Sequence, residues 1–163
     1  MIYVALGANM PSAAGPPTAT LRRALAAMPK QGIEVLTVSA FYRSPAWPDP
    51  TDPPFVNAVA AVKTRLLPGE LLKALLAIEK LFGRVRKRPN EPRTLDLDLI
   101  DFGGLVSDAE QLMLPHPRMH ERAFVLRPLA DIAPTWRHPD TGEAVLALLG
   151  NVGEAGLERL EGA

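Results

Sequence analysis

The sequence contains no cysteine, which excludes disulfide bonds, thiolate catalysis and cysteine-based zinc sites. It has no apolar run approaching the roughly 20 residues of a membrane-spanning helix. No basic segment precedes the first apolar stretch, so we expect that stretch to be a strand and not a signal peptide. The formal net charge is zero, so no global attraction to nucleic acid or to a membrane surface is expected. A cytoplasmic protein with one domain, residues 1–163, fits these features.

The pattern of apolar residues predicts a protein of the α+β class. Runs rich in β-branched and aromatic residues predict strands at residues 2–6, 33–42, 55–62 and 95–102. Apolar residues at helical spacing, bounded by proline and glycine, predict helices at residues 18–28 and 68–82. This order is that of a ferredoxin-like βαββαβ core with a mostly antiparallel sheet. We expect a short strand at 112–114 and helices at 121–132 and 143–149 to extend this core into a three-layer αβα sandwich.

Two aspartates, Asp96 and Asp98, lie two residues apart on the last predicted core strand. Because side chains alternate along a strand, both carboxylates should point to one face, with their Cα atoms about 6.5–7 Å apart. A cation would relieve their repulsion, and Mg²⁺ binds through one or two carboxylates together with substrate phosphates. The alternative is a half-exposed strand that carries charge on its outer positions.

A basic segment comes directly before this acidic pair. Residues 84–93 carry five basic side chains and one acidic side chain. Because arginine forks match phosphate oxygens, cations beside metal-binding carboxylates are the parts that phosphoryl transfer needs. A solvated loop, or a loop that binds RNA phosphates, is the alternative. The aromatic pattern of RNA-binding sheets is absent from the sequence, and the two aspartates would repel a nucleic-acid backbone.

The most specific strings in the chain are Arg84-Val85-Arg86-Lys87 and Pro92-Arg93-Thr94-Leu95-Asp96-Leu97-Asp98. They resemble the signature of the 6-hydroxymethyl-7,8-dihydropterin pyrophosphokinase family. Weaker markers agree with this family in order and spacing, so that the resemblance covers most of the chain. These markers are Ala5-Leu6-Gly7-Ala8-Asn9, Phe41-Tyr42-Arg43-Ser44-Pro45, Phe55-Val56-Asn57-Ala58, Leu114-Pro115-His116-Pro117, Arg122-Ala123-Phe124 and Pro128-Leu129.

The resemblance implies a Mg²⁺-dependent enzyme of folate synthesis. Such an enzyme transfers the β,γ-pyrophosphoryl unit of ATP to the hydroxymethyl oxygen of the dihydropterin and releases AMP. Asp96 and Asp98 would hold two Mg²⁺ ions, while Arg84 and Arg93 would stabilise charge on the transferring group. The family also implies that ATP binds first and that residues 84–93 move on binding, but the sequence singles out no general base. The further implied ATP contacts are Arg86, Lys87, Arg88, Leu99, His116 and Arg122.

A flat pterin needs aromatic faces and a hydrogen-bonding edge. Phe55 and Phe124 resemble the stacking pair of the family. Asn57 offers both donors and an acceptor inside an apolar run, where an amide is otherwise costly to bury. The implied pterin site is completed by Ser44, Pro45 and Trp47, and further candidates at family positions are Glu79, Gly7 and Asn9.

Several of these residues also have simpler interpretations. Phe55, Phe124 and Leu99 would be ordinary core residues if each were considered alone. His116 would be a loop histidine between prolines, and Glu79 an exposed residue of a helix.

The chain departs from the family near the expected nucleotide site. The segment 88–92 is shorter than usual and lacks a tryptophan that many members have. Gln111, Met113 and Pro117 replace residues that are frequent near ATP. These departures affect the expected nucleotide affinity more than the expected reaction.

Two other functions compete with the enzyme hypothesis. A non-catalytic RNA- or nucleotide-binding module on the same core would show tight, salt-sensitive binding without Mg²⁺. A catalytically inactive relative is disfavoured because Asp96, Asp98, His116 and Arg122 are all present. We expect a monomer that binds ATP and the pterin, and that binds neither nucleic acid nor a membrane.

Overall fold

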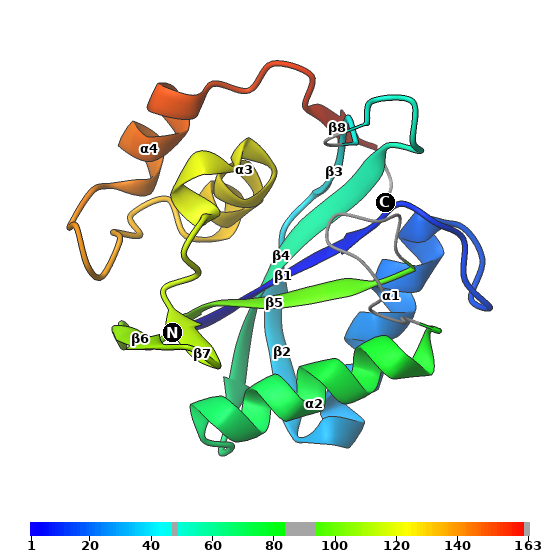
Figure 1. The fold of residues 1–163 in the computed structure, drawn as a ribbon, viewed down its shortest axis with the longest axis horizontal. Coiled ribbons are helices and arrows are strands. Elements are labelled where there is room, and N and C mark those ends of the chain that lie inside the picture. The colour runs from blue at the N-terminus through cyan, green and yellow to red at the C-terminus, as the bar shows by residue number, and fades with distance from the viewer. Residues whose placement is uncertain (47–48, 84–93, 162–163) are drawn as a thin grey trace.

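The computed structural model describes residues 1–46, 49–83 and 94–161, and it has a sheet between two pairs of helices (Figure 1). No helix within these described ranges has both the length and the apolar character needed to cross a membrane. The elements in chain order are β1 (Ile2–Ala8), α1 (Pro17–Ala27), η1 (Met28–Gln31), β2 (Ile33–Val38), β3 (Phe41–Ser44), β4 (Phe55–Thr64), α2 (Pro68–Leu81), β5 (Asp96–Phe102), β6 (Ser107–Ala109), β7 (Leu112–Leu114), η2 (Met119–Glu121), α3 (Ala123–Ile132), α4 (Val145–Val152) and β8 (Glu158–Leu160).

The main sheet has six strands in the order β5-β1-β4-β3-β8, with β2 also paired to β4. Each of these pairings is antiparallel. The order β5-β1-β4-β2 is that of a ferredoxin-like core, so the predicted α+β class and mostly antiparallel sheet are confirmed. β5 lies at one edge of the sheet and, among the described strands, pairs with β1 alone in this sheet.

Side-chain alternation along the strands builds one core on each face of the sheet. In β1, Val4 and Leu6 face the core that contains α1 and α2, whereas Tyr3 and Ala5 face the core that contains α3 and α4. Helices therefore cover both faces, as Figure 1 shows, and the predicted three-layer arrangement is confirmed. Buried helical residues of the first core include Leu21, Ala24, Leu71, Leu75 and Ile78, and those of the second include Val125, Leu126, Leu129, Val145 and Leu148.

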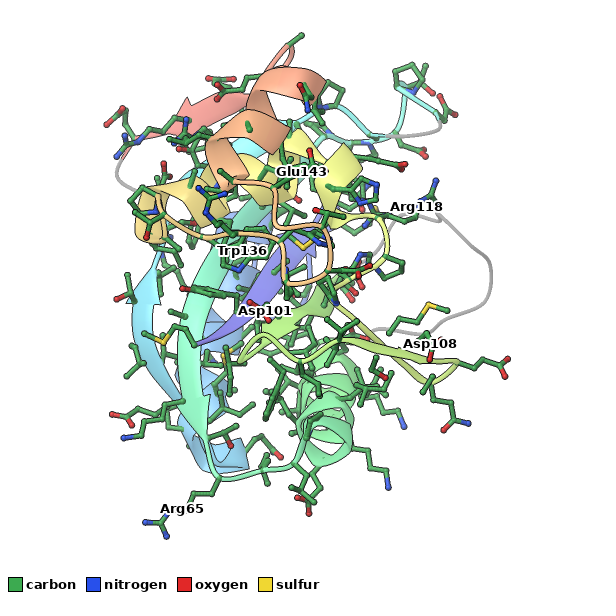
Figure 2. All side chains as sticks on the ribbon, turned by 90° about the vertical axis from the view of Figure 1, so that its left-hand side faces the viewer. Arg65, Asp101, Asp108, Arg118, Trp136 and Glu143 are labelled. Carbon is green, nitrogen blue, oxygen red and sulfur yellow. The ribbon has the colours of Figure 1, made fainter. Side chains whose placement is uncertain are left out.

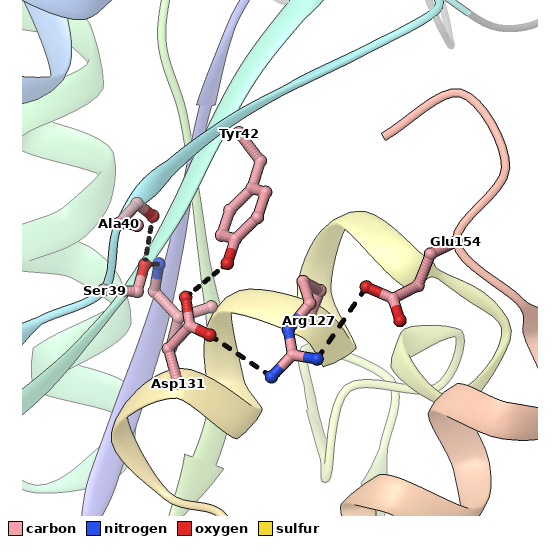
Figure 3. Close-up of polar contacts among 7 residues, drawn as sticks. Ser39, Ala40, Tyr42, Arg127, Asp131 and Glu154 are labelled. Atoms are coloured by element: carbon pink, nitrogen blue, oxygen red, sulfur yellow. Dashed lines mark hydrogen bonds and ion pairs between the residues drawn. The ribbon is translucent and has the colours of Figure 1, made fainter. Parts of the chain in front are cut away.

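The prediction of one continuous strand over residues 33–42 was wrong, because the chain breaks at Ser39 into β2 and β3. The amide of Ser39 donates to the carbonyl oxygen of Val59 at 2.9 Å, but the amide of Val59 donates to Ser39 Oγ at 3.0 Å. The hydroxyl also donates to the carbonyl of Ala40 at 2.7 Å (Figure 3). A side chain thus replaces one main-chain acceptor of the ladder, and β3 continues along the other half of β4.

Smaller differences concern the ends of elements and the shortest strands. α3 begins at Ala123 and not at residue 121, because the preceding residues form the 3₁₀ turn η2. α4 begins at Val145 and not at residue 143. The sequence did not predict β8, whose three residues include two charged ones and are held by pairing with β3.

A polar network connects β3 with α3 and with the segment before β8 (Figure 3). The hydroxyl of Tyr42 donates to Asp131 Oδ2 at 2.6 Å. Arg127 binds the other oxygen of the same carboxylate at 3.2 Å and reaches Glu154 at 3.8 Å. Burial, together with the hydrogen bond to Asp131, raises the pKa of Tyr42 to about 12, so the phenol keeps its proton at neutral pH. The network therefore fixes α3 against the sheet.

We expect Tyr42→Phe to lower the free energy of unfolding by about 1.5–3 kcal/mol, the range for a hydrogen bond to a charged group. Urea unfolding measures this loss. Arg43→Gln is the matched control, because it removes the exposed ion pair of 3.3 Å with Glu158 between β3 and β8. That control should cost less than about 1 kcal/mol. Equal losses in the two variants would show that the Tyr42 hydroxyl has no special role.

Candidate active site

A cavity of about 340 Å³ lies on the α3 side of the sheet. Strands β1, β3, β4 and β5 supply its floor, and the residues around η2 and the start of α3 supply its wall. The cavity is therefore assembled by tertiary folding from distant parts of the sequence. Its lining residues are Ala5, Leu6, Gly7, Ser44, Pro45, Phe55, Asn57, Asp96, Asp98, Arg118, Glu121, Arg122, Phe124 and Val125.

Asp96 and Asp98 of β5 line this cavity and are half-buried. Asp96 is in register with Gly7 of β1, and Asp98 is in register with Ala5. Leu97 between them belongs to the core on the opposite face of the sheet. The predicted orientation of the two carboxylates toward one face is therefore confirmed.

Glu79 is buried, with 1% of its surface exposed, although its position in α2 was also compatible with an exposed residue. Its Oε2 accepts a hydrogen bond of 2.8 Å from the amide of Leu97. This amide lies on the edge strand β5, between the two aspartates. Glu79 thus satisfies a donor that a neighbouring strand would otherwise satisfy, and it holds β5 where the carboxylates face the cavity.

We expect Glu79→Ala to lower the free energy of unfolding by about 1–3 kcal/mol, because the amide of Leu97 would lose this acceptor in a buried position. Glu79→Gln keeps an acceptor oxygen and should recover most of the loss. The control is Lys80→Ala, an exposed neighbour on the same helix, which should change stability by less than about 0.5 kcal/mol. Chemical denaturation tests all three, and an alanine variant as stable as the wild type would contradict the role of this bond.

Asn57 and Ser44 form a hydrogen-bonding edge, called the amide edge below, on the same floor of the cavity as the carboxylates. Asn57 pairs with Gly7 across β4 and β1, and it is 5% exposed. Its Nδ2 donates to Ser44 Oγ of β3 at 2.8 Å. A Cβ on Gly7 would stand 3.1 Å from Asn57 Oδ1, so glycine at this position leaves room for that oxygen. The structure therefore brings together three residues that the sequence placed in the site.

Two aromatic side chains, Phe55 and Phe124, complete the apolar part of the cavity. The guanidinium of Arg122 lies 5.5 Å from the ring centroid of Phe124, in a cation–π contact. Asn9 does not line the cavity; its Nδ2 donates to the carbonyl of Pro53 at 3.1 Å and so ties the end of β1 to the segment before Phe55. Asn9 thus has a structural contact outside the cavity.

His116 lies beside the cavity and lines a neighbouring one of about 300 Å³, together with Met113. Its Nδ1 accepts a hydrogen bond of 3.2 Å from the amide of Arg118, so Nε2 carries the proton of the neutral ring. Burial and the charge of Arg122 lower the pKa of His116 to about 4, against the opposing effect of Asp96. His116 is therefore a neutral hydrogen-bond donor at pH 7.

The remaining predicted residues divide into three groups. Pro45 lines the cavity as predicted. The side chain of Leu99 is 5% exposed and belongs to the core on the α1 and α2 side, so it points away from the carboxylates. The predicted contacts outside the described residues are Trp47, Arg84, Arg86, Lys87, Arg88 and Arg93.

Sequence reasoning missed Arg118 and Glu121, two charged residues that line the cavity from the turn before α3. Arg118 follows His116 by two residues, which is the single sequence signal that could have drawn attention to it. Neither residue lies in a periodic pattern of apolar residues that would predict which way it faces. The position of each therefore depends on how η2 packs.

The pair of carboxylates fits Mg²⁺, which takes hard oxygen ligands and completes its shell with water and substrate phosphates. Within the described residues, no group of three or more histidine, aspartate or glutamate side chains is arranged to hold a metal ion. Two half-buried carboxylates at a cavity of this size instead suit an ion that arrives together with a phosphate ligand.

The fold and the cavity define a small α+β protein whose ligand site combines two carboxylates, an amide edge and aromatic side chains. The model of the 7,8-dihydro-6-hydroxymethylpterin-pyrophosphokinase family matches residues 3–134. The chain belongs to this family.

Curated relatives agree with this assignment. A protein of Synechocystis named 2-amino-4-hydroxy-6-hydroxymethyldihydropteridine pyrophosphokinase is 43% identical over 150 residues, which are 91% of this chain and 74% of that protein. A protein of the same name from Pseudomonas aeruginosa is 44% identical over 163 residues, which are 99% of this chain and 98% of that protein.

Solved structures are similar in fold. An HPPK-DHPS chain of Plasmodium falciparum, crystallised with pteroate, matches with a TM-score of 0.73 at 11% identity and covers 97% of this chain and 46% of its own. An HPPK-DHPS in complex with substrates matches with a TM-score of 0.72 at 13% identity, covering 98% of this chain and 46% of its own. This chain therefore spans less than half of these solved chains, and the likeness shows the fold.

Proposed function

We propose that this chain transfers a pyrophosphoryl group from ATP to the hydroxymethyl group of 6-hydroxymethyl-7,8-dihydropterin, giving AMP and the pterin diphosphate in folate biosynthesis. Family membership and the names of the relatives support this reaction. One structural observation carries the proposal: a single cavity holds both the carboxylate pair of β5 and the amide–aromatic pocket. These are the chemical requirements of the two ends of the transfer.

The pterin binds at the amide–aromatic end of the cavity. Phe55 and Phe124 supply apolar faces for the flat ring. Asn57 donates one N–H to Ser44, so its remaining N–H and its Oδ1 are oriented for the amino-oxo edge of the pterin. Pro45 lies at the same end of the cavity, and Trp47, which the family resemblance also implies there, lies outside the described residues.

The nucleotide phosphates bind at the carboxylate end, where Asp96 and Asp98 would hold two Mg²⁺ ions. Bound there, the ions would supply positive charge that lowers the barrier to attack. His116 donates from Nε2 and Arg122 from its guanidinium to the nucleotide. The cationic side is completed by residues outside the described ranges, namely Arg84, Arg86, Lys87, Arg88 and Arg93.

In the transfer, the hydroxymethyl oxygen of the pterin forms a bond to the β-phosphorus of ATP, and its proton is released to solvent. The bond between the β-phosphorus and the oxygen that bridges it to the α-phosphorus breaks, and AMP leaves. The amide of Asn57 lies on β4 and the carboxylates lie on β5, and both strands pair with β1 in one sheet. The two substrates are therefore held in fixed orientation, and the entropic part of the barrier falls.

We further propose that residues 1–163 act as a single pyrophosphokinase domain and as a monomer in the cytoplasm. The zero net charge supports the absence of nucleic-acid and membrane partners.

Incubation of the full chain with ATP, Mg²⁺ and the hydroxymethyl dihydropterin tests the reaction. Chromatography should show one AMP for each pterin diphosphate formed, and no AMP when the pterin is left out. A folded chain that forms no AMP under these conditions would refute the proposal. Tight RNA binding that weakens with salt and needs no Mg²⁺ would instead favour a binding module.

A further inference from the structure

Arg118 places a guanidinium group at the cavity that holds Asp96 and Asp98. The residue is exposed and directly precedes η2. Figure 2 shows Arg118 at the level of α3 and Arg65 at the opposite end of the molecule. Arg118 therefore brings a cationic residue to the same cavity as the two carboxylates.

The main chain at Arg118 is anchored, so the freedom of this residue is confined to its side chain. Its amide donates to His116 Nδ1 at 3.2 Å, and the amide of Met119 donates to the carbonyl of His116 at 3.3 Å. The side chain of Met119 is fully buried in the core. The same contact that anchors the main chain of Arg118 also holds the imidazole of His116 with its proton on Nε2.

Three other arginines of the described chain bind oxygens of the protein itself. Arg127 binds Asp131, Arg43 binds Glu158, and Arg137 donates to the carbonyl of Gly142 at 3.0 Å. By contrast, within residues 1–46, 49–83 and 94–161 no carboxylate or carbonyl oxygen binds the guanidinium of Arg118. Its five N–H groups are thus available to a ligand.

The charges of the cavity favour an anionic ligand for this group only when divalent ions are present. Asp96, Asp98 and Glu121 give the described lining three carboxylates, against the two guanidiniums of Arg118 and Arg122. A phosphate chain that carries divalent ions toward the aspartates still needs cations on its other side. The planar fork of arginine matches two phosphate oxygens at once.

We infer that Arg118 is a nucleotide-binding residue, whose guanidinium donates to phosphate oxygens of ATP beside the Nε2–H of His116. This inference rests on the proposed function, because it takes the ligand of the carboxylate end to be a Mg²⁺-bound nucleotide. It assigns a role to a residue for which the sequence resemblance implied none.

The test compares Arg118→Gln with Arg65→Gln in the full chain. Calorimetry measures the dissociation constant of a non-hydrolysable ATP analogue with Mg²⁺, and separately that of adenosine, which has no phosphates. Arg118→Gln should weaken the analogue about tenfold or more and leave adenosine unchanged, because a charge-assisted hydrogen bond is lost. Arg118→Lys should recover part of the affinity, and Arg65→Gln should behave as the wild type.

Two results would overturn the assignment: analogue binding by Arg118→Gln within twofold of the wild type, or an equal loss of affinity for adenosine. With the analogue saturating, pterin affinity should be the same in all variants, since Arg118 lies on the turn before α3 and not on the amide edge. A wild-type chain that forms no AMP would refute the proposed function as a whole. A wild-type chain that forms AMP, with an unaffected Arg118→Gln, would refute the role of Arg118 alone.

Discussion

Replacing Asp98 with asparagine is expected to slow AMP formation about 10³-fold at saturating substrates, which corresponds to ~4 kcal/mol of activation free energy. Asparagine keeps the size of the side chain and one oxygen, but it removes the negative charge that a divalent ion requires of its carboxylate ligand. Because Asp98 is half-buried at a cavity and not in the core, the fold should survive. The measurement is the initial rate of AMP release over a range of Mg²⁺ concentrations.

Glu34→Gln is the matched control for Asp98→Asn. It removes one exposed carboxylate from β2 and does not alter the lining of the cavity. Its rate should equal that of the wild type, and the unfolding free energy of Asp98→Asn should stay within about 1 kcal/mol of the wild type. A rate for Asp98→Asn within tenfold of the wild type would remove this carboxylate from the metal site.

Replacing Asn57 with alanine is expected to weaken pterin binding about 30- to 100-fold, because two hydrogen bonds to the ligand edge are lost. Asn57 is buried and fixed by Ser44 Oγ, so its amide meets the ligand without reorganisation. Calorimetry with the ATP analogue saturating measures the dissociation constant of the pterin. The affinity for the analogue itself should change by less than about twofold, because the amide lies at the pterin end of the cavity.

Asn151→Ala serves as the control for Asn57→Ala, since Asn151 is an exposed asparagine of α4. It should leave pterin affinity unchanged. If Asn57→Ala bound the pterin within threefold of the wild type, the pterin edge would have to be recognised elsewhere in the cavity.

The orientation of the acidic pair could be predicted from the sequence because it depends on strand periodicity alone. Leucine alternates with aspartate in β5, and a period of two places Asp96 and Asp98 on one face and Leu97 on the other. The structure confirms this geometry. Their role as metal ligands stays a prediction, because it depends on a ligand and not on the backbone.

The role of Glu79 could not be predicted because it depends on which main-chain group of the edge strand β5 lies beside α2. A helical pattern shows which residues share a face, but it does not show that the amide of Leu97 lies on the outer edge of the described sheet, beside α2. The break between β2 and β3 at Ser39 could not be predicted from the sequence for a similar reason. The residues of β2 and β3 have strand propensity on both sides, and the hydroxyl that replaces a ladder acceptor binds Val59, 20 residues away.

The wall of the cavity was predicted less completely than its floor. Gly7 and Asn57 were expected in the site because they stand at family positions on predicted strands, and the structure pairs them across β1 and β4. Arg118 and Glu121 come from an irregular turn, where no periodicity links sequence to position. Tertiary packing of the buried Met119 places these charges at the cavity.

A crystal structure of the chain with Mg²⁺, a non-hydrolysable ATP analogue and the pterin would test the central claim most directly. We expect carboxylate oxygens of Asp96 and Asp98 at about 2.0–2.1 Å from Mg²⁺ ions that also bind the phosphates. Phosphates bound in the cavity with no ion between them and these two carboxylates would contradict the account.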